Sequence, residues 1–458
     1  MSKIFIEEAE KYEKEGDLSK AILSLKKALQ LDPENYIIQL ELGNLCTSNK
    51  QFEEAAGYFR RCLYQFKSNV DIKNALCFSL TSFGNENYLE SKFQLSEACF
   101  EEVLEYEKNN WVYYYNLANT QDKLNKTSKA YENYQKAIQL NPNDADLWNN
   151  NGNAERKLGY LDKAITSYQN ALKIKPDLFH ALAHLTHQKQ HMCDWDNIDQ
   201  YFQKICSIVN TNTGALISPF AFVANPLSFP QDQLICANQW TQNHFKDRPF
   251  KKEKWRQKNK IRIGYLSSDF KLHPLYFLIR DVIKYHNRDI FDIYAYDASP
   301  HENTNERNTI ISLFDCYRDI SSLNDEKAVS LINNDEIDIF IDLTGYTNNS
   351  RAFIAPQLKN TITINWLGYP GTMGLTQEKP LYDYILADDF IIPKADEKYY
   401  AETILRLPFA YQPNIENRSQ SNHRDRHDYG IPSDSFVYCA FNQSFKITED
   451  IFKAWLTL

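Results

Sequence analysis

The chain has 458 residues, enough for two or three domains, and 43% of them are hydrophobic, which is ordinary for a globular protein. Its formal net charge of -9 argues against a general nucleic-acid-binding protein, whose surface would be basic. The charged N-terminus lacks the apolar core of a signal peptide, and no apolar stretch approaches the length of a membrane span. Nine dispersed cysteines without metal-ligand spacing favour a reducing compartment. We therefore expect a cytoplasmic protein, or a nuclear one if its source is eukaryotic, with no membrane or nucleic-acid partner.

The N-terminal third repeats with a period of 34 residues. Four positions match at this offset: Ala130, Tyr134, Ala137 and Pro142 recur as Ala164, Tyr168, Ala171 and Pro176. The period is that of the tetratricopeptide repeat, in which each unit is a pair of antiparallel helices. Stacked units share a continuous core and curve around a concave groove. We predict an α-solenoid of about five repeats over residues 1–178, with about seven extra residues in its most irregular unit.

Two asparagines mark a candidate groove in this array. Asn116 and Asn150 occupy the same position of successive repeats, on the first helix of each pair. That helix lines the concave face, where side-chain amides can hydrogen-bond the backbone of an extended peptide without reading its sequence. We interpret the pair as part of a groove for protein or peptide partners. The alternative is that both are solvated polar positions.

Residues 179–258 lose the 34-residue period but remain rich in apolar residues. This pattern predicts a helical bridge rather than a flexible linker, with helices near 198–209 and 231–244. A basic run from Lys251 to Arg262 closes the segment. A solvated connector between domains explains it most simply, and a nucleic-acid or lipid patch is the alternative.

Over residues 259–430, short apolar strands alternate with helices, a pattern typical of a parallel, doubly wound Rossmann-like domain. We expect strands at 261–267, 291–296, 337–343, 361–367 and 384–387, and helices at 275–285, 306–314 and 325–333. Ligands collect beyond the carboxyl ends of such strands. Three loops with candidate side chains or glycines follow strands there, at residues 268–274, 344–347 and 368–372. They outline one site, although the chain contains no dinucleotide-binding or P-loop motif.

Residues 431–458 predict the start of a second, incomplete Rossmann-like domain. We expect a strand at Phe436–Ala440 and a helix that Thr448 caps. Between them, Lys446 is well placed to bind a phosphate. Since one strand and one helix cannot make a sheet with two covered faces, we expect the rest of this domain to lie beyond Leu458.

Taken in order, these features resemble one family. The repeats, Cys193-Asp194-Trp195 and the strings IRIGYLSSDFKLHP, LTGYT, NWLGYPGTMG, YQPN and FVYCAFNQSFKI are similar to those of the protein O-GlcNAc transferases, particularly bacterial-type members. The resemblance covers essentially the whole chain. It implies a glycosyltransferase-B core of two Rossmann-like domains. It also implies inverting transfer of GlcNAc from UDP-GlcNAc to Ser or Thr hydroxyls of proteins, without a metal ion or another cofactor.

The resemblance also implies roles for single residues. Lys446 and Gln443 match contacts to the donor diphosphate, where a metal-free enzyme needs positive charge for the departing nucleotide. His273 matches a histidine proposed as the base, so we expect it to be catalytic or to position the acceptor. The loop residues expected to face the donor and acceptor are Thr347, Gly368, Tyr369, Gly371 and Thr372. Where animal members carry a second histidine, this chain has Asp338.

Two other functions fit the same residues. The first is a catalytically inactive repeat scaffold that binds peptides, and the second is a transferase of the same fold that uses another sugar or acceptor. Since the donor loops of a second domain are expected beyond Leu458, we expect residues 1–458 alone to show no measurable transferase activity.

Overall fold

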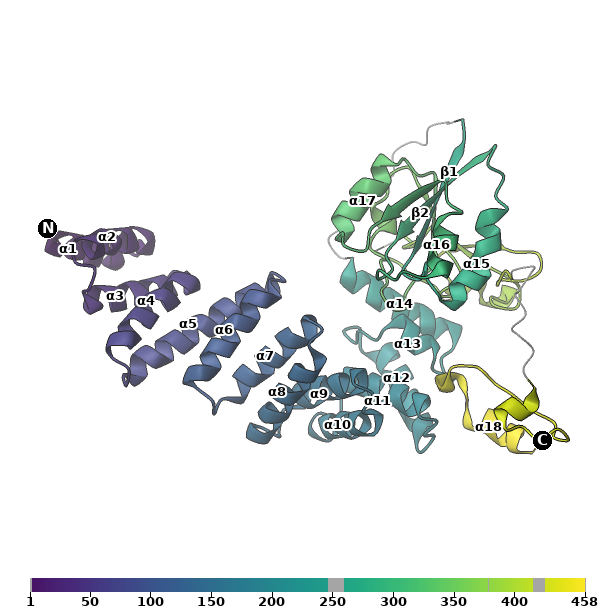
Figure 1. The fold of residues 1–458 in the computed structure, drawn as a ribbon, viewed down its shortest axis with the longest axis horizontal. Coiled ribbons are helices and arrows are strands. Elements are labelled where there is room, and N and C mark those ends of the chain that lie inside the picture. The colour runs from purple at the N-terminus through teal and green to yellow at the C-terminus, as the bar shows by residue number, and fades with distance from the viewer. Residues whose placement is uncertain (1, 246–258, 378, 415–424, 458) are drawn as a thin grey trace. The chain divides into compact units, whose positions relative to one another are not determined.

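The computed structural model describes residues 2–245, 259–377, 379–414 and 425–457 (Figure 1). Contacts divide the chain into two compact units, Met1–Gln188 and Lys189–Leu458. In the described part of the chain, no helix combines the length and apolar character that crossing a bilayer requires.

The first unit is an α-solenoid built of antiparallel helix pairs, as the 34-residue period predicts (Figure 1). Its described pairs are α1 (Ser2–Lys14) with α2 (Leu18–Leu31), α3 (Tyr36–Ser48) with α4 (Phe52–Gln65), α5 (Val70–Leu89) with α6 (Phe93–Tyr106), α7 (Trp111–Lys123) with α8 (Thr127–Leu140), and α9 (Ala145–Lys157) with α10 (Leu161–Ile174). Asn35, Asn69, Asn110 and Asp144 begin the first helices of the later pairs, because each side chain accepts free backbone N–H groups of the first turn.

Three of the helix pairs set a glycine of the first helix against an aromatic ring of the second. Three such contacts join residues sixteen apart: Gly43 with Phe59, Gly84 with Phe100, and Gly152 with Tyr168. A Cβ atom at Gly152 would lie 2.6 Å from the ring of Tyr168, so a larger residue would force the helices apart. These contacts explain why glycine recurs at this position of the first helices.

The extra residues of the irregular repeat lengthen one helix. The packed glycine is the eighth residue of α3 and of α9 but the fifteenth of α5. Seven residues add almost two full turns, so the face that packs against the neighbouring helices is preserved along α5. The insertion is therefore absorbed without breaking the stack.

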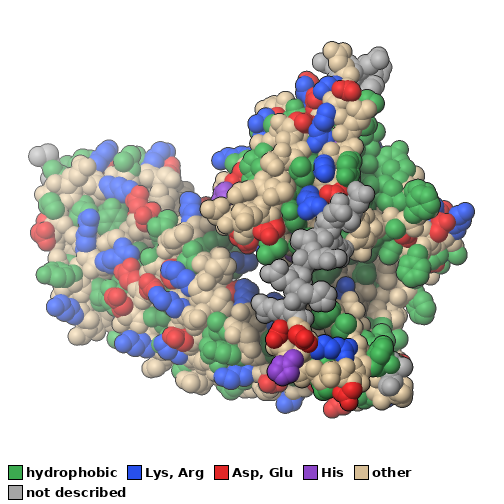
Figure 2. Space-filling view, turned by 45° about the vertical axis from the view of Figure 1, so that its right-hand side comes forward, with side chains coloured by type: hydrophobic (Ala, Val, Ile, Leu, Met, Phe, Trp, Pro, Cys, Tyr) green, Lys and Arg blue, Asp and Glu red, His purple; other side chains and the backbone are tan. Residues whose placement is uncertain are grey.

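Ion pairs tie successive repeats together at the surface of this unit. Arg60 lies 2.6 Å from Glu102 and Lys157 lies 2.7 Å from Asp122. Basic and acidic side chains are likewise interspersed over the face of the molecule seen in Figure 2. Each exposed pair contributes at most about 1 kcal/mol, so these contacts refine a fold that the apolar core determines.

The predicted helical bridge opens the second unit. Helix α11 (Phe179–His191) crosses the boundary between the units and is followed by α12 (Ile198–Thr211), α13 (Pro219–Val223) and α14 (Pro230–His244). The two helices expected in this segment are confirmed as α12 and α14. The basic run at 251–262 falls mostly outside the described residues.

A parallel seven-stranded sheet follows, in the order β3-β2-β1-β4-β5-β6-β7. The strands are β1 (Ile261–Ser267), β2 (Phe291–Asp297), β3 (Cys316–Asp319), β4 (Ile339–Asp342), β5 (Ile362–Asn365), β6 (Tyr384–Ala387) and β7 (Thr403–Arg406). The doubly wound prediction is confirmed, but β3 and β7 were not predicted. Both are edge strands whose side chains are exposed or half-buried, so neither has the apolar run that identifies a central strand.

Helices cover both faces of the sheet. On one face, α15 (Pro274–Lys284) and α16 (Asn305–Ile311) pack with inward residues such as Tyr265. On the other face, α17 (Asp325–Asn334) packs with Leu266, the next residue of β1. Because alternate residues of a strand point to opposite faces, β1 supplies both cores, and its polar loop is left at the carboxyl edge.

The last described segment contains η3 (Arg426–Tyr429), η4 (Ser444–Lys446) and α18 (Glu449–Leu456). Thr448 caps α18 as predicted, accepting the N–H of Ile451. The strand expected at Phe436–Ala440 is wrong, because these residues are irregular and exposed. A strand needs a hydrogen-bonding neighbour, and among the described residues the sheet ends at β7.

Candidate functional site

The site lies at the carboxyl edge of the sheet, where β1, β4 and β5 are neighbours. The backbone N–H of Ser268, just after β1, donates to Thr344 Oγ1 at 3.3 Å, and its hydroxyl donates to the carbonyl of Asn348 at 3.4 Å. Both acceptors belong to the segment after β4. The structure therefore brings together the loops that the sequence predicted to share one edge.

Glycine allows the loops after β4 and β5 to touch. A Cβ atom at Gly368 would lie 2.3 Å from the carbonyl oxygen of Leu343, which is closer than any real side chain could approach. Gly345 has a φ of +56°, in the left-handed region that other residues rarely adopt. The second loop thus lies directly against the first.

The side chain of Tyr369 packs in the core beneath the loop after β5. Its side chain is 1% exposed, and its ring centroid lies 5.6 Å from that of Tyr346 in an edge-to-face arrangement. The Asn365 amide donates to the carbonyl of Tyr369 at 2.9 Å. Burial raises the pKa of Tyr369 well above its ordinary value, which keeps the phenol neutral. A ligand at this edge would meet the loop backbone rather than this side chain.

Thr372 and Gly371 are also buried, and a carboxylate from the far edge of the sheet fixes this part of the loop. The Thr372 hydroxyl donates to Glu402 at 2.8 Å, and the N–H of Met373 donates to the same carboxylate at 2.6 Å. Glu402 immediately precedes β7 and is fully enclosed, so burial raises the pKa of its carboxyl to about 7. No motif marked Glu402 in the sequence, since only the fold brings it to the loop.

His273 caps α15 at the mouth of the same edge. Its Nδ1 accepts the N–H of Leu275 at 3.3 Å, and its side chain is 42% exposed. A ring nitrogen that accepts a proton donor is itself unprotonated, so the neutral ring carries its proton on Nε2. Asp269 Oδ2 lies 4.0 Å from Nδ1. Thr347 is half-buried in the neighbouring loop.

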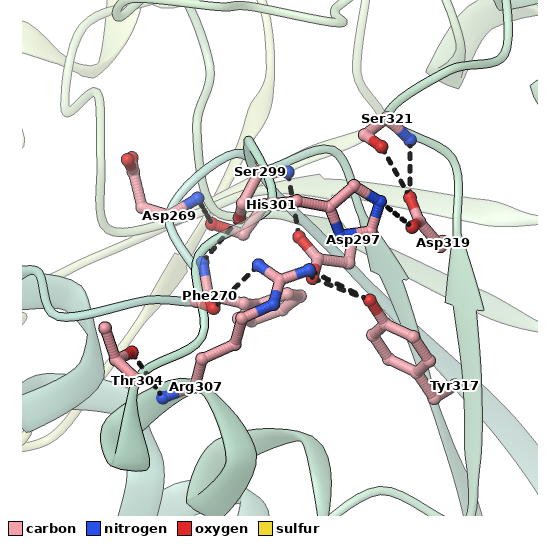
Figure 3. Close-up of polar contacts among 11 residues, drawn as sticks. Asp269, Phe270, Asp297, Ser299, His301, Thr304, Arg307, Tyr317, Asp319 and Ser321 are labelled. Atoms are coloured by element: carbon pink, nitrogen blue, oxygen red, sulfur yellow. Dashed lines mark hydrogen bonds and ion pairs between the residues drawn. The ribbon is translucent and has the colours of Figure 1, made fainter.

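A buried ion pair braces the loop that carries His273 (Figure 3). Arg307 of α16 lies 2.6 Å from Asp297 at the end of β2, with side chains 5% and 0% exposed. The guanidinium also donates to the carbonyl of Phe270 at 3.3 Å, and Tyr317 of β3 donates to Asp297 at 3.0 Å. Sequence analysis did not predict this network, because its members come from α16, β2, β3 and the loop after β1, which are separate in the chain.

Asp338 lies at the opposite end of β4 from the loops. It precedes the first residue of that strand, is 3% exposed, and accepts the backbone N–H of Arg262 at 2.8 Å. Its carboxylate therefore helps to hold β1 beside β4.

Gln443 and Lys446 lie on the η4 turn, and both are exposed. The hydrogen bonds of this turn with distant residues run to the segment 190–195 at the end of α11. The structure thus packs the loop that carries His273 against the segment after β4, and it places Gln443 and Lys446 beside the end of α11.

The predicted groove asparagines belong to a row of polar side chains. Asn150 donates to Tyr115 Oη at 3.0 Å and to Asn119 Oδ1 at 3.1 Å, both on α7. Asn116 donates to Asn85 Oδ1 of α5 at 3.5 Å. The row therefore runs across three successive first helices of the array.

Family models match most of this architecture. Residues 192–414 match glycosyl transferase family 41, and tetratricopeptide-repeat models match residues 13–76, 111–144 and 152–187. Among the described residues, no group of three or more His, Cys, Asp or Glu could hold a metal ion.

Curated relatives carry related names. The chain is 28% identical over 297 residues to the probable UDP-N-acetylglucosamine–peptide N-acetylglucosaminyltransferase SEC of Arabidopsis thaliana, which covers 60% of this chain and 30% of that protein. It is 26% identical over 237 residues to the UDP-N-acetylglucosamine–peptide N-acetylglucosaminyltransferase of Caenorhabditis elegans. This alignment covers 48% of this chain and 20% of that protein. The chain thus spans less than a third of these relatives. Among solved structures, a mutant O-GlcNAc transferase of Thermobaculum terrenum aligns with a TM-score of 0.48 at 21% identity, covering 84% of this chain and 66% of that one.

Proposed function

Since residues 192–414 form a glycosyltransferase family 41 region on a chain that also carries tetratricopeptide repeats, we propose that the protein transfers GlcNAc from UDP-GlcNAc to Ser and Thr hydroxyls of proteins. The observation that carries this proposal is the family match over the region whose three loops pack into one site. The names of the curated relatives support the same reaction.

The proposed reaction is an in-line attack by the acceptor hydroxyl on the anomeric carbon. The new bond forms as the bond from that carbon to the diphosphate oxygen breaks, and the hydroxyl proton is lost to a base or to solvent. Negative charge then develops on the departing UDP. Exposed Lys446 would neutralise this charge, Gln443 would donate to the phosphates, and the first turn of α18 would add its N–H groups. These residues make a metal-free mechanism chemically reasonable.

In this proposal, Lys446 belongs to the start of the second domain of a glycosyltransferase-B core, and the sheet edge belongs to the first. The loops at Thr347 and at Gly368–Thr372 would face the donor and the acceptor. Since Tyr369, Gly371 and Thr372 are buried, they would act mainly by fixing the loop backbone.

His273 would position the acceptor hydroxyl. With Nδ1 accepting the N–H of Leu275, the exposed Nε2–H is a donor and not a base. For the ring to act as a base through Nε2, its proton would have to move to Nδ1, where Asp269 could orient it. A base role therefore requires the cap of α15 to open.

The repeat array would present protein substrates. The amides of Asn116 and Asn150 continue a row that could bind the backbone of an extended peptide, which suits a transferase with many acceptors. The compartment that we propose is the cytoplasm. All nine cysteines are free thiols, and five of them are buried, which is the usual state in a reducing environment.

The test is transfer itself. A polypeptide that continues these residues through a complete second Rossmann-like domain is incubated with an acceptor peptide and UDP-GlcNAc, UDP-glucose or UDP-galactose in separate reactions. The intact peptide is weighed by mass spectrometry with and without a metal chelator. We expect one N-acetylhexosamine to be added only from UDP-GlcNAc, with or without the chelator. Addition of another sugar would overturn the donor assignment. Binding of the peptide without any addition would favour a scaffold.

A further inference from the structure

A corner between the first two helices of the bridge holds the turn that carries Lys446. We call Cys193, Asp194 and Trp195 the Cys-Asp-Trp corner. It follows the end of α11, where Cys193 adopts a left-handed φ of +51° that turns the chain. The N–H of Asp194 donates to the carbonyl of Lys189 at 2.9 Å, and the two side chains form an ion pair in which Lys189 is nearly buried. These contacts fix the direction in which the corner presents its other side chains.

Those side chains bind backbone carbonyls of the η4 turn, about 250 residues away. Trp195 Nε1 donates to the carbonyl of Ile447 at 3.2 Å. The Cys193 thiol donates to the carbonyl of Ser444 at 3.8 Å. In the reverse direction, the Ser444 hydroxyl donates to the carbonyl of His191 at 2.7 Å. The corner therefore binds the turn mainly through backbone carbonyls of the turn.

Ring contacts extend the same docking. The centroid of His191 lies 5.2 Å from that of Phe445, and the centroid of Trp195 lies 5.3 Å from that of Phe452 on α18. Aromatic pairs at such distances contribute beyond the area that they bury. The indole of Trp195 thus contacts both the turn and the helix whose N-terminus follows it.

This arrangement sorts the side chains of the turn. Ser444, Phe445 and Ile447 are half-buried against the corner, whereas Gln443 and Lys446 remain exposed. Inside the turn, the N–H of Lys446 donates to the carbonyl of Gln443 at 3.0 Å, so the two exposed residues are fixed relative to each other.

We propose that the Cys-Asp-Trp corner is a positioning element, which holds the η4 turn so that Gln443 and Lys446 face the diphosphate of a bound nucleotide. This inference rests on the proposed function for the identity of the ligand. Trp195 is the central positioning residue because its N–H donates to the carbonyl of Ile447, next to the η4 turn, and its ring contacts Phe452 on α18. It touches neither the sugar nor the reacting atoms, and it acts through Lys446.

The first measurement is hydrogen exchange of residues 443–452 in the full chain. Trp195→Phe removes the indole N–H but keeps a ring against Phe452, and we expect about three- to ten-fold faster exchange in this segment. The matched control is Trp148→Phe, because Trp148 also donates its Nε1–H to a backbone carbonyl, that of Pro142, at 2.8 Å in the repeat array. The control should leave the segment unchanged. Ser444→Ala removes the hydrogen bond that the turn donates to the carbonyl of His191. It should also speed exchange in this segment, and it replaces Trp195→Phe as the test if that variant disturbs folding.

The second measurement is UDP affinity by calorimetry in a double-mutant cycle, made in the polypeptide that includes a complete second domain. Trp195→Phe should weaken UDP binding about three- to ten-fold in the wild-type background. It should change the affinity less than about two-fold when Lys446 is already alanine, since the corner acts through that lysine. A loss of general stability would instead lower UDP affinity equally in both backgrounds.

The outcomes separate the two proposals. Unchanged exchange in Trp195→Phe and Ser444→Ala, or losses of UDP affinity that simply add in the cycle, would overturn the positioning role. If Lys446→Ala leaves UDP affinity unchanged, or if the wild-type polypeptide with its complete second domain binds no UDP, the donor site of the proposed function fails. The exchange result would then still show whether the corner holds the turn.

Discussion

In the repeat array, Asn150 meets Tyr115 and Asn119 on the adjacent first helix, about one repeat away along the chain. In the second unit, Arg307 of α16 contacts Asp297 of β2 and the carbonyl of Phe270 in the loop after β1, and Trp195 donates to a carbonyl 252 residues away. The array thus builds its surface by repeating one local contact, whereas the α/β unit builds its site from loops that only the fold brings together. A change in the array should act locally, while a change in a loop should disturb its neighbours.

The sharpest contrast should come from two glycines. Gly368→Ala would push a methyl group against the Leu343 carbonyl, and we expect it to lower the free energy of unfolding by about 3 kcal/mol or more. Gly57 of α4 has open space around it, so Gly57→Ala should raise stability by about 0.5–1 kcal/mol through helix propensity. Urea unfolding of each variant measures both effects. A harmless Gly368→Ala would show that the two loops do not touch.

Two buried groups, one in each unit, should make opposite contributions to the pH dependence of stability. Glu402 has a pKa of about 7 when folded, against an ordinary 4.5, so its contribution to the stability of the second unit is present below pH 4.5 and is lost as pH rises to 7. Burial lowers the pKa of His184 in the array to about 4, against an ordinary 6.5. Its contribution is present above pH 6.5 and is lost as pH falls to 4. Each change amounts to about 3 kcal/mol.

Hydrogen exchange during urea unfolding, followed on peptides from each unit, distinguishes these slopes. Glu402→Gln should flatten the slope of the second unit and leave that of the array unchanged. His184→Gln should flatten the slope of the array and leave that of the second unit unchanged, because glutamine can still donate to Asn149 but cannot titrate. A slope that Glu402→Gln or His184→Gln leaves unchanged would contradict the burial of the substituted group.

In a polypeptide with a complete second domain, Lys446→Ala should lower turnover about 10²-fold, which corresponds to a barrier about 2.7 kcal/mol higher, because a preorganised charge next to the leaving diphosphate is lost. Lys453→Ala is the matched control, since Lys453 is exposed on α18 and pairs with Glu449 at 2.7 Å. Peptide mass spectrometry under initial-rate conditions measures both. Equal rates in the two variants would remove Lys446 from the donor site.

The smallest effect is expected in the groove. Asn116→Ala should weaken binding of an acceptor peptide about three- to ten-fold, on the scale of one hydrogen bond, and should leave UDP affinity unchanged. Fluorescence anisotropy with two peptides of unrelated sequence measures the effect. Similar losses for both peptides would support recognition of the backbone, whereas a loss for one peptide alone would contradict it.

The sequence was informative where contacts are periodic or local. The 34-residue period predicted the helix pairs, strand β1 and strand β6 were predicted at their observed bounds, and the Thr448 cap was found from one side chain. The adjacency of the three loops also followed from parallel strands sharing one edge. These predictions depend on patterns that lie within a single element or repeat.

The sequence was uninformative where the fold itself makes the contact. Glu402 and Arg307 reach the site loops from separate elements, so neither lies in a motif. Edge strands β3 and β7 lack a continuous apolar run, and the strand expected at Phe436–Ala440 fails because no described segment pairs with it. The η4 turn docks on the Cys-Asp-Trp corner, although the two motifs lie about 250 residues apart and nothing in the sequence connects them.

The most direct test of the account is to map the two ligands onto the two units. Hydrogen exchange of the full chain is measured alone, with UDP and with an acceptor peptide. We predict that UDP protects residues 443–449 and the loops at 344–348 and 368–374, while the peptide protects the first helices α5, α7 and α9. Protection of the repeat array by UDP, or no protection of residues 443–449, would contradict the division of donor and acceptor binding between the two units.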